Sequence, residues 1–278
     1  MYPIRVSQSF IKAVVNQNYE IDRCPKYAYQ TYISKEAKSV SSLNMLRGQY
    51  FETGMIGSTV SGEGVYSLPL AKGKPSAVTQ RIDKQIVNGK AVMDSLGFHR
   101  EFAQTVLHLP YNDNYYFEGV ADLAFEVFEG RPAIVDLKLT ESLDANYGKF
   151  AWGLGEDRGT PMNDIVRVLP SQYDPLQNQL YLTLSTNNNT QFIYNNELIP
   201  VQLNDCIFCY LVFEREKHLR WRMFVVELTP NDVLELRERT RIFLSDIPYI
   251  IKNKNRELPN MDRCRICAVT NCNSRKII

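Results

Sequence analysis

The sequence predicts an α/β fold in which a mixed central β-sheet is flanked by helices. Residues 115–139 are rich in aromatic and β-branched residues on both sides of a short turn, which is typical of a β-hairpin. Residues 206–214 are almost entirely apolar, and a second strand-like run follows at 220–228. The intervening segments are helical or rich in loops, so that strands and helices are mixed along the chain.

The first half of the chain contains the clearest strand pattern. Helices are expected at 8–18 and 35–57, followed by a helical and loop-rich segment at 76–108. The hairpin has strands at 115–128 and 132–139. Its second strand opens with a proline, which is tolerated at the first position of a strand.

The second half alternates between loops, helices and strands. A loop with four glycines at 148–164 precedes a helix at 169–185, whose leucines recur every fourth residue, as in a core-facing stripe: Leu176, Leu180 and Leu184. The strands near 206–214 and 220–228 come next. A helix at 229–247 opens with Thr-Pro-Asn-Asp, which places proline at the first helical position.

The hairpin is the most informative segment, because it places two carboxylates and a lysine together. Side chains alternate along a strand, so Asp136 and Lys138 share one face of the sheet. A three-residue loop at 129–131 sets Asp122 opposite Lys138 and brings all three side chains to that face. The plainer alternative is a solvated strand face with two opposite charges.

These residue types suit a divalent metal site. Hard cations such as Mg²⁺ or Mn²⁺ prefer oxygen ligands, which Asp122, Asp136 and the carbonyl of Leu137 offer. Lys138 would orient or help to deprotonate an attacking water and would offset the charge of a phosphate.

The hairpin resembles the PD-(D/E)xK nuclease superfamily. Gly119-Val120-Ala121-Asp122 matches its G-x-x-D motif, and Asp136-Leu137-Lys138 matches its (D/E)-x-K motif. Two further segments are similar to the RecB-like branch: 177–181 matches Q-x-x-x-Y, and 46–52 resembles G-x-x-(F/Y)-(E/H). The resemblance implies a restriction-endonuclease-like core within a single nuclease domain at 1–278, with a helical and loop elaboration at 58–110.

The same resemblance implies roles for three more residues. Gln177 would support the metal site, Tyr181 would contact DNA, and Glu52 would be a further acid beside the metal. The alternatives are an ordinary amphipathic helix around Gln177 and an exposed helical glutamate at position 52.

The cysteines indicate a second metal site. Cys264, Cys267 and Cys272 lie within nine residues of each other, and three cysteines at such spacing suggest metal ligation. RecB-like nucleases with a [4Fe–4S] cluster take a fourth ligand from the start of the domain, and Cys24-Pro25 with the residues after it resembles their C-P-x-(K/R)-(F/Y) signature. The segment 260–278 would then pack around residue 24. The spacing of two then four residues departs from the expected two then five, and zinc is the alternative ion.

The remaining pair, Cys206 and Cys209, resembles a metal motif but lies in the apolar run at 206–213. Alternation along a strand directs the two sulfurs to opposite faces, so core packing is the favoured interpretation.

Composition and resemblance together predict the function. With 44% hydrophobic residues and neither a secretory segment nor a membrane span, the chain is expected to be cytoplasmic. Its net charge of +1 means that contact with DNA would need local positive charge. The resemblance implies a metal-dependent DNA exonuclease acting on single strands or duplex ends, similar to CRISPR-associated RecB-like and phage enzymes, with CRISPR-adaptation or recombination proteins as partners. The alternatives are a non-catalytic nucleic-acid-binding or assembly subunit and a structural zinc protein.

Overall fold

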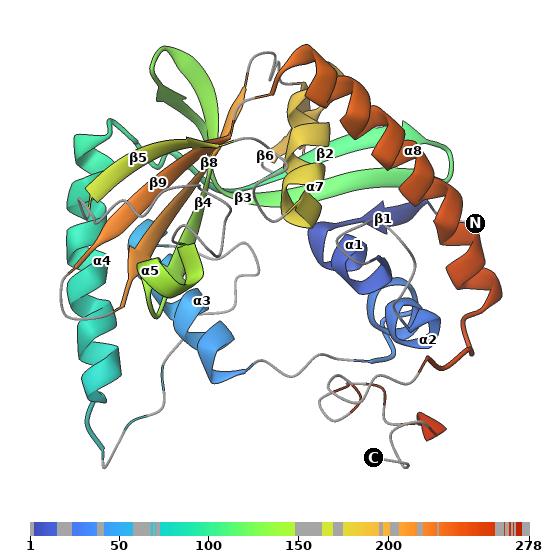
Figure 1. Cartoon of the computed structure of the whole chain (residues 1–278), viewed down its shortest axis with the longest axis horizontal. Helices are drawn as coiled ribbons and strands as arrows, with labels where there is room; N and C mark the ends of the chain where they lie inside the picture. The colour runs from blue at the N-terminus through green and yellow to red at the C-terminus, as the bar shows by residue number, and fades with distance from the viewer. Residues whose placement is uncertain are drawn as a thin grey trace.

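The computed structural model of the chain is drawn in Figure 1. The residues it describes are 3–15, 24–37, 42–57, 68, 70, 73–147, 163–168, 175–194, 197–200, 206–215, 219–226, 228–258, 264, 267, 269 and 271–273. The helices are α1 (Gln8–Val14), α2 (Pro25–Ala28), the π-helix η1 (Tyr29–Ile33), α3 (Leu43–Ile56), α4 (Ala77–Ser95), α5 (Leu143–Tyr147), α7 (Pro175–Ser185) and α8 (Pro230–Lys252).

The strands form one mixed sheet. They are β1 (Ile4–Val6), β2 (Phe102–Asn112), β3 (Tyr115–Phe128), β4 (Arg131–Thr140), β5 (Asn163–Val168), β6 (Gln191–Tyr194), β7 (Glu197–Pro200), β8 (Ile207–Glu214) and β9 (Trp221–Val226). Their order is β5-β9-β8-β4-β3-β2-β6-β7, and β1 pairs with β3 outside this path. The pairs β4–β8, β5–β9 and β1–β3 are parallel, and the others are antiparallel. The predicted fold class, a mixed sheet flanked by helices, is confirmed.

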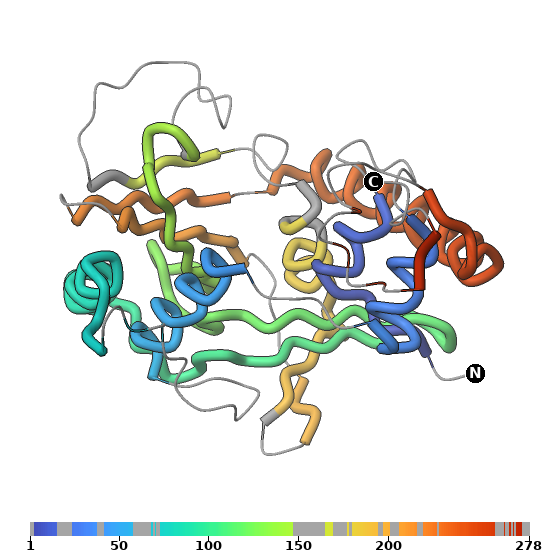
Figure 2. The backbone as a smooth tube through the Cα atoms, turned by 90° about the horizontal axis from the view of Figure 1, so that it is seen from below, coloured from blue at the N-terminus to red at the C-terminus, as the bar shows by residue number. Residues whose placement is uncertain are grey.

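Two apolar cores lie on the two faces of this sheet. Along β8, Phe208 and Tyr210 belong to the first core, whereas Cys209 and Leu211 belong to the second, as alternation requires. Helices α1, α7 and α8 pack in the first core, and α3 and α4 pack in the second. In Figure 2 the long strands β2 and β3 (green) run from the α3 and α4 side of the molecule to the α1 and α2 side. Both faces of β8 are therefore buried.

Strand β3 passes from one core to the other. Ala121 packs in the first core and Leu123 in the second, so Asp122 lies at the boundary between them.

Helix α4 lies within the expected helical and loop elaboration at 58–110, but the end of this range differs from the prediction, because residues 102–112 form the inner strand β2. This strand pairs with both β3 and β6. Its buried residues alternate at 105, 107 and 109, which is the signal that the sequence analysis missed.

Helix α8 also differs from its prediction, because it continues through Pro248 to Lys252. A proline inside a helix removes one backbone hydrogen bond. Ile247 and Ile250 on either side of it are fully buried, and this packing outweighs the loss. In the described ranges, no helix combines the length and the apolar content that crossing a bilayer requires.

Candidate active site

The β3–β4 hairpin turns through two residues. Glu129 and Gly130 both have left-handed backbone, with φ of 51° and 75°. Phe128 pairs with Arg131 across them, which is the geometry of a two-residue turn that follows the twist of the strands. The predicted three-residue loop at 129–131 is therefore wrong.

A β-bulge in β3 compensates for the shorter turn. The register shifts by one residue between Glu126 and Leu123, and Phe125 within this stretch has left-handed backbone with φ of 58°. Beyond the bulge, Leu123 pairs with Val135. Residues of β3 before Leu123 that continue this pairing, including Asp122, therefore lie on the same face of the sheet that the predicted three-residue loop would have given them.

The two aspartates lie where β3 and β4 separate. Continuing the pairing places Asp122 across from Asp136, and not across from Lys138 as predicted. The Asp122 Oδ2 atom accepts a hydrogen bond from the N–H of Leu137 at 2.6 Å. A side chain of β3 thus accepts a hydrogen bond from a backbone N–H of β4. The two carboxylates share one face of the sheet.

Three carboxyl groups meet at this point. Asp122 and Asp136 are 8% and 6% exposed, and Glu52 of α3 is hydrogen-bonded to Asp122. Burial raises the pKa of Asp122 well above its usual value, and the nearby Asp136 and Glu52 raise it further. Burial is also the main cause of the raised pKa of Glu52. Three acids gathered in a buried place repel one another when ionised, which favours protonation of at least one of them.

Lys138 extends from the acids toward solvent. Its Nζ contacts Asp136 Oδ2, and its side chain is 32% exposed, against 8% for that of Asp136. The same Nζ lies 5.9 Å from the ring centroid of Tyr210, a buried residue of β8, in a cation–π contact. A positive charge is therefore held at the open end of the acidic cluster.

Helix α7 supplies a hydrogen bond from its first turn. The Gln177 Nε2 atom donates to Asp136 Oδ1 at 2.9 Å, and Gln177 is buried. The helix approaches β3 closely at Gly119, where a Cβ would lie 3.1 Å from Leu180. The glycine of the G-x-x-D motif thus lets α7 approach, and the helix in turn positions Gln177.

Tyr181 is buried beside the acidic cluster. It is 5% exposed, its hydroxyl donates to the carbonyl of Val120 at 2.6 Å, and its ring stacks on Phe208. The expectation that Tyr181 contacts DNA stays a prediction. In this geometry its contact supports β3 two residues before Asp122.

Two residues at the site were not predicted from the sequence. Gln104 of β2 donates a hydrogen bond to Glu52 Oε1, and Tyr210 lies beneath Lys138. A lone glutamine has no motif to mark it. Tyr210 belongs to an apolar run, and its place beside Asp136 depends on the parallel register of β4 and β8, which no local pattern reveals.

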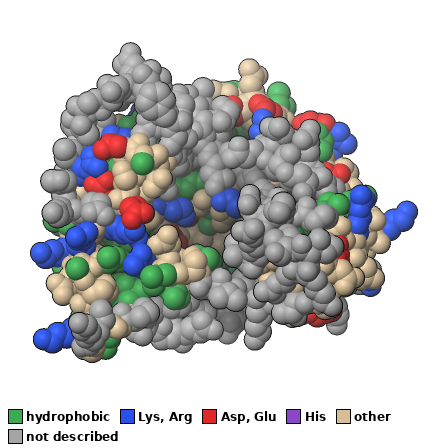
Figure 3. Space-filling model, turned by 60° about the horizontal axis from the view of Figure 1, so that its bottom comes forward, with side chains coloured by type: hydrophobic (Ala, Val, Ile, Leu, Met, Phe, Trp, Pro, Cys, Tyr) green, Lys and Arg blue, Asp and Glu red, His purple; other side chains and the backbone are tan. Residues whose placement is uncertain are grey.

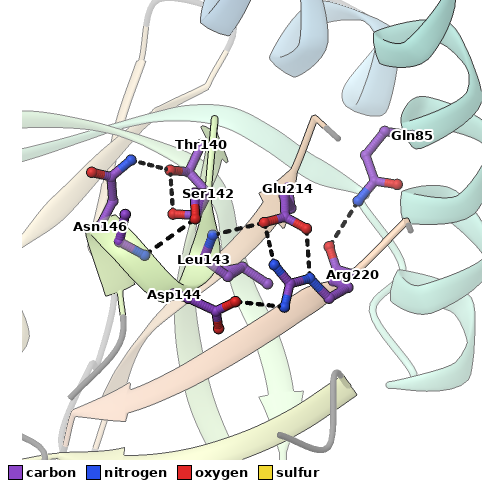
Figure 4. A network of polar contacts seen from close by, with 9 residues as sticks. Gln85, Thr140, Ser142, Leu143, Asp144, Asn146, Glu214 and Arg220 are labelled. Carbon is purple, nitrogen blue, oxygen red and sulfur yellow. Dashed lines mark hydrogen bonds and ion pairs between the residues drawn. The ribbon is translucent and has the colours of Figure 1, made fainter. Parts of the chain in front are cut away.

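A separate polar network fixes the chain just beyond the acids (Figure 4). Glu214, which is 1% exposed, accepts hydrogen bonds from Arg220 Nε at 2.6 Å and from the N–H of Leu143 at 3.0 Å. Arg220 also contacts Asp144 at 2.8 Å. The network ties α5 to the β8–β9 turn, and α5 directly follows the strand on which Asp136 lies.

The acidic cluster has the donor set for a hard divalent cation. Asp122, Asp136 and Glu52 offer carboxylate oxygens, the ligands that Mg²⁺ and Mn²⁺ prefer. As they stand, no three His, Cys, Asp or Glu side chains in the described part of the chain are arranged so that they could hold a metal ion. Here the oxygens contact Lys138, the N–H of Leu137 and each other. Buried acids that repel one another still fit such a cation, because its charge would offset their mutual repulsion.

The described pieces of the C-terminal segment lie near α2 in the N-terminal region (Figure 1). Burial raises the pKa of Cys267, and the neighbouring thiols of Cys24, Cys272 and Cys264 raise it further. Cys272 also packs with Ala37 in a small apolar cluster. The predicted closure of this segment onto the region around residue 24 is confirmed.

Polar contacts hold the two ends together as well. The Lys26 Nζ atom lies 2.9 Å from Glu257 Oε1 and 2.8 Å from the carbonyl of Asn271. Glu257 also accepts the N–H of Asn273 at 3.1 Å. These contacts join the cysteine segment to α2 through groups that are not metal ligands.

The other two cysteines are core residues. Cys206 packs in the first core and Cys209 in the second, and they are 8% and 0% exposed. Burial raises the pKa of Cys206 to about 12. The prediction that they lie on opposite faces of a buried strand is confirmed.

No protein-family model and no curated protein sequence matches this chain. In structure it is similar to the protein crystallised under the name "Putative exonuclease" from Eubacterium rectale, with a TM-score of 0.52 at 16% sequence identity. The similarity covers 98% of this chain and 86% of that one. The two chains share a fold.

Proposed function

We propose that this protein is a metal-dependent DNA nuclease of the PD-(D/E)xK type, in the RecB-like branch, and that it acts as an exonuclease on single strands or duplex ends. The observation that supports this most strongly is the meeting of Glu52, Asp122, Asp136 and Lys138 at one point of the sheet. The fold shared with a protein named as an exonuclease agrees with it.

The chain's own groups define the chemistry. Asp122, Asp136 and Glu52, with the carbonyl of Leu137, would hold Mg²⁺ or Mn²⁺. The bound cation would supply charge stabilisation at the phosphate and lower the pKa of a water. Lys138, at the solvent end of the cluster, would orient the attacking water and offset the charge of the phosphate. Gln177 fixes Asp136 throughout, and hydrolysis by water needs no covalent intermediate.

DNA would approach from the open side of the cluster. Figure 3 shows one face of the molecule, with Lys and Arg side chains in and around a hollow near its middle. Local positive charge of this kind attracts a phosphate backbone even though the net charge is only +1.

Digestion of end-labelled DNA tests the function. Linear single- and double-stranded DNA, labelled at the 5′ or the 3′ end, should be degraded in Mn²⁺ or Mg²⁺, and EDTA should stop the reaction. Covalently closed circular DNA should resist, as an exonuclease requires. Undiminished cleavage in EDTA, or none with either cation, would contradict the proposal.

Removing the negative charge of Asp122 should stabilise the protein when it is free of metal. The pKa of Asp122 is raised, so the folded protein keeps a proton that the unfolded chain releases above about pH 4. Stability in EDTA should therefore fall as the pH rises from about 4 to neutral. Asp122→Asn cannot ionise, so it should melt at a higher temperature than the wild type at neutral pH. This gain should shrink toward pH 4, and Mn²⁺ should raise the melting temperature of the wild type only.

We also propose that Cys24, Cys264, Cys267 and Cys272 bind a [4Fe–4S] cluster, with zinc as the alternative. Protein purified without oxygen should be brown and contain iron, or colourless with one bound zinc. Cys267→Ala should lose most of this metal and melt at a lower temperature, because a site between the chain ends stabilises the fold. Cys206→Ala is the control, since it should keep the wild-type metal content. Equal metal content in both variants would contradict the assignment.

A further inference from the structure

Gln104 has an unusual backbone for its place in the fold. It lies inside β2, where the flanking residues Ala103 and Thr105 pair with Leu123 and Ala121 of β3. Its own φ is 54°, in the left-handed region that residues with a Cβ seldom adopt. Glycine or asparagine would adopt this backbone more readily, so the side chain needs a separate explanation.

The side chain of Gln104 reaches the acidic cluster. The pairs on either side of it place Gln104 of β2 opposite Asp122 of β3, and its Nε2 donates a hydrogen bond to Glu52 Oε1. Glu52 is in turn hydrogen-bonded to Asp122. The acid on α3 is therefore held on one side by an amide from β2 and faces an aspartate of β3 on the other.

A second amide side chain also donates a hydrogen bond to an acid of the cluster. Gln177 of α7 donates to Asp136 from the other side of the cluster. An amide donor orients a carboxylate without adding charge, so it does not compete with a cation as an ammonium group would. Strained backbone that survives in a folded protein tends to cluster at functional sites.

We propose that Gln104 is a positioning residue that holds Glu52 as the third carboxylate of the cation site. The inference rests on the proposed function. Gln104 touches neither substrate nor cation; it acts through Glu52, and its left-handed backbone is what directs the amide toward that acid.

The test compares two glycine variants. Gln104→Gly removes the amide and relieves the backbone, so the fold should be as stable as the wild type or more stable. Arg100→Gly is the matched control, because Arg100 also has left-handed backbone, with φ of 61°, and its side chain contacts Asp94 instead of the acidic cluster. Calorimetric titration with Mn²⁺ and melting curves with and without Mn²⁺ give readouts that are independent of activity.

We expect Gln104→Gly to bind Mn²⁺ roughly tenfold more weakly, as loss of a hydrogen bond to a charged group implies. Its cleavage rate should approach that of the wild type at saturating Mn²⁺, while the Mn²⁺ concentration for half-maximal rate rises by a similar factor. Arg100→Gly should match the wild type in both measurements. If Gln104→Gly binds Mn²⁺ as tightly as the wild type, the positioning role is wrong and the proposed function stands. If the wild type itself binds no Mn²⁺, the proposed function fails, and this inference fails with it.

Discussion

Replacing Asp136 by alanine should lower cation-dependent DNA cleavage by at least about 10³-fold, while the protein stays folded. The carboxylate is a proposed ligand, and a catalytic metal contributes several kcal/mol to the transition state, with each 1.36 kcal/mol worth a factor of ten. Lys138→Met should lower the rate by roughly 10²- to 10³-fold, because it removes a preorganised charge. The rates are measured on labelled linear DNA in Mn²⁺, with circular dichroism as the check on folding.

Glu141→Gln is the matched control for these variants. Glu141 follows β4 three residues after Lys138, but its side chain is 65% exposed and contacts Arg215. Its substitution should leave the rate nearly unchanged. The more conservative Asp136→Asn guards against a folding defect and should be as inactive as the alanine variant. Normal turnover by a folded Asp136→Ala protein would show that the metal-site assignment is wrong.

Replacing Glu214 by alanine should lower the free energy of unfolding by about 3–5 kcal/mol, the cost of breaking a buried ion pair. The side chains of Glu214 and Arg220 are 2% and 12% exposed, and Glu214 also accepts the N–H of Leu143. The substitution leaves a partly buried guanidinium, which keeps only its contact with Asp144, and a backbone donor without this acceptor. Urea unfolding followed by circular dichroism gives the free energy.

A neighbouring Glu–Arg pair provides the comparison. Glu141→Ala breaks the contact with Arg215, whose acid partner is exposed, and should cost only about 0–1 kcal/mol. Glu214→Gln keeps an acceptor for one of the donors, so its loss should fall between the two. If Glu214→Ala and Glu141→Ala lower the free energy of unfolding equally, burial of the acid does not determine the strength of the ion pair.

The elements with strong local patterns were predictable from the sequence. Alternation along β4 indicated that Asp136 and Lys138 share a face, and the apolar run of β8 indicated a strand buried on both faces. The short strands β1, β6 and β7 have three or four residues each, which is too few for alternation to stand out.

The geometry of the site was less predictable, because it depends on contacts between distant segments. The predicted pairing of Asp122 failed because a two-residue turn and a bulge at Phe125 together replace the expected loop. The resemblance led to Gln177, which hydrogen-bonds Asp136, but it did not indicate that Tyr181 is buried, because this burial depends on how α7 packs on β3. Gln104 could be identified as a residue of the site only from the fold, because no local sequence pattern marks it.

The proposed nuclease activity requires that the acidic cluster bind a divalent cation. Anomalous diffraction from crystals soaked in Mn²⁺ tests it most directly, because the signal locates the ion without reference to activity. We expect a peak bounded by the carboxylates of Asp122 and Asp136, with Glu52 beside it, and no such peak in crystals of Asp122→Asn. Crystals of the wild type in which Mn²⁺ is bound elsewhere, or not at all, would contradict the account.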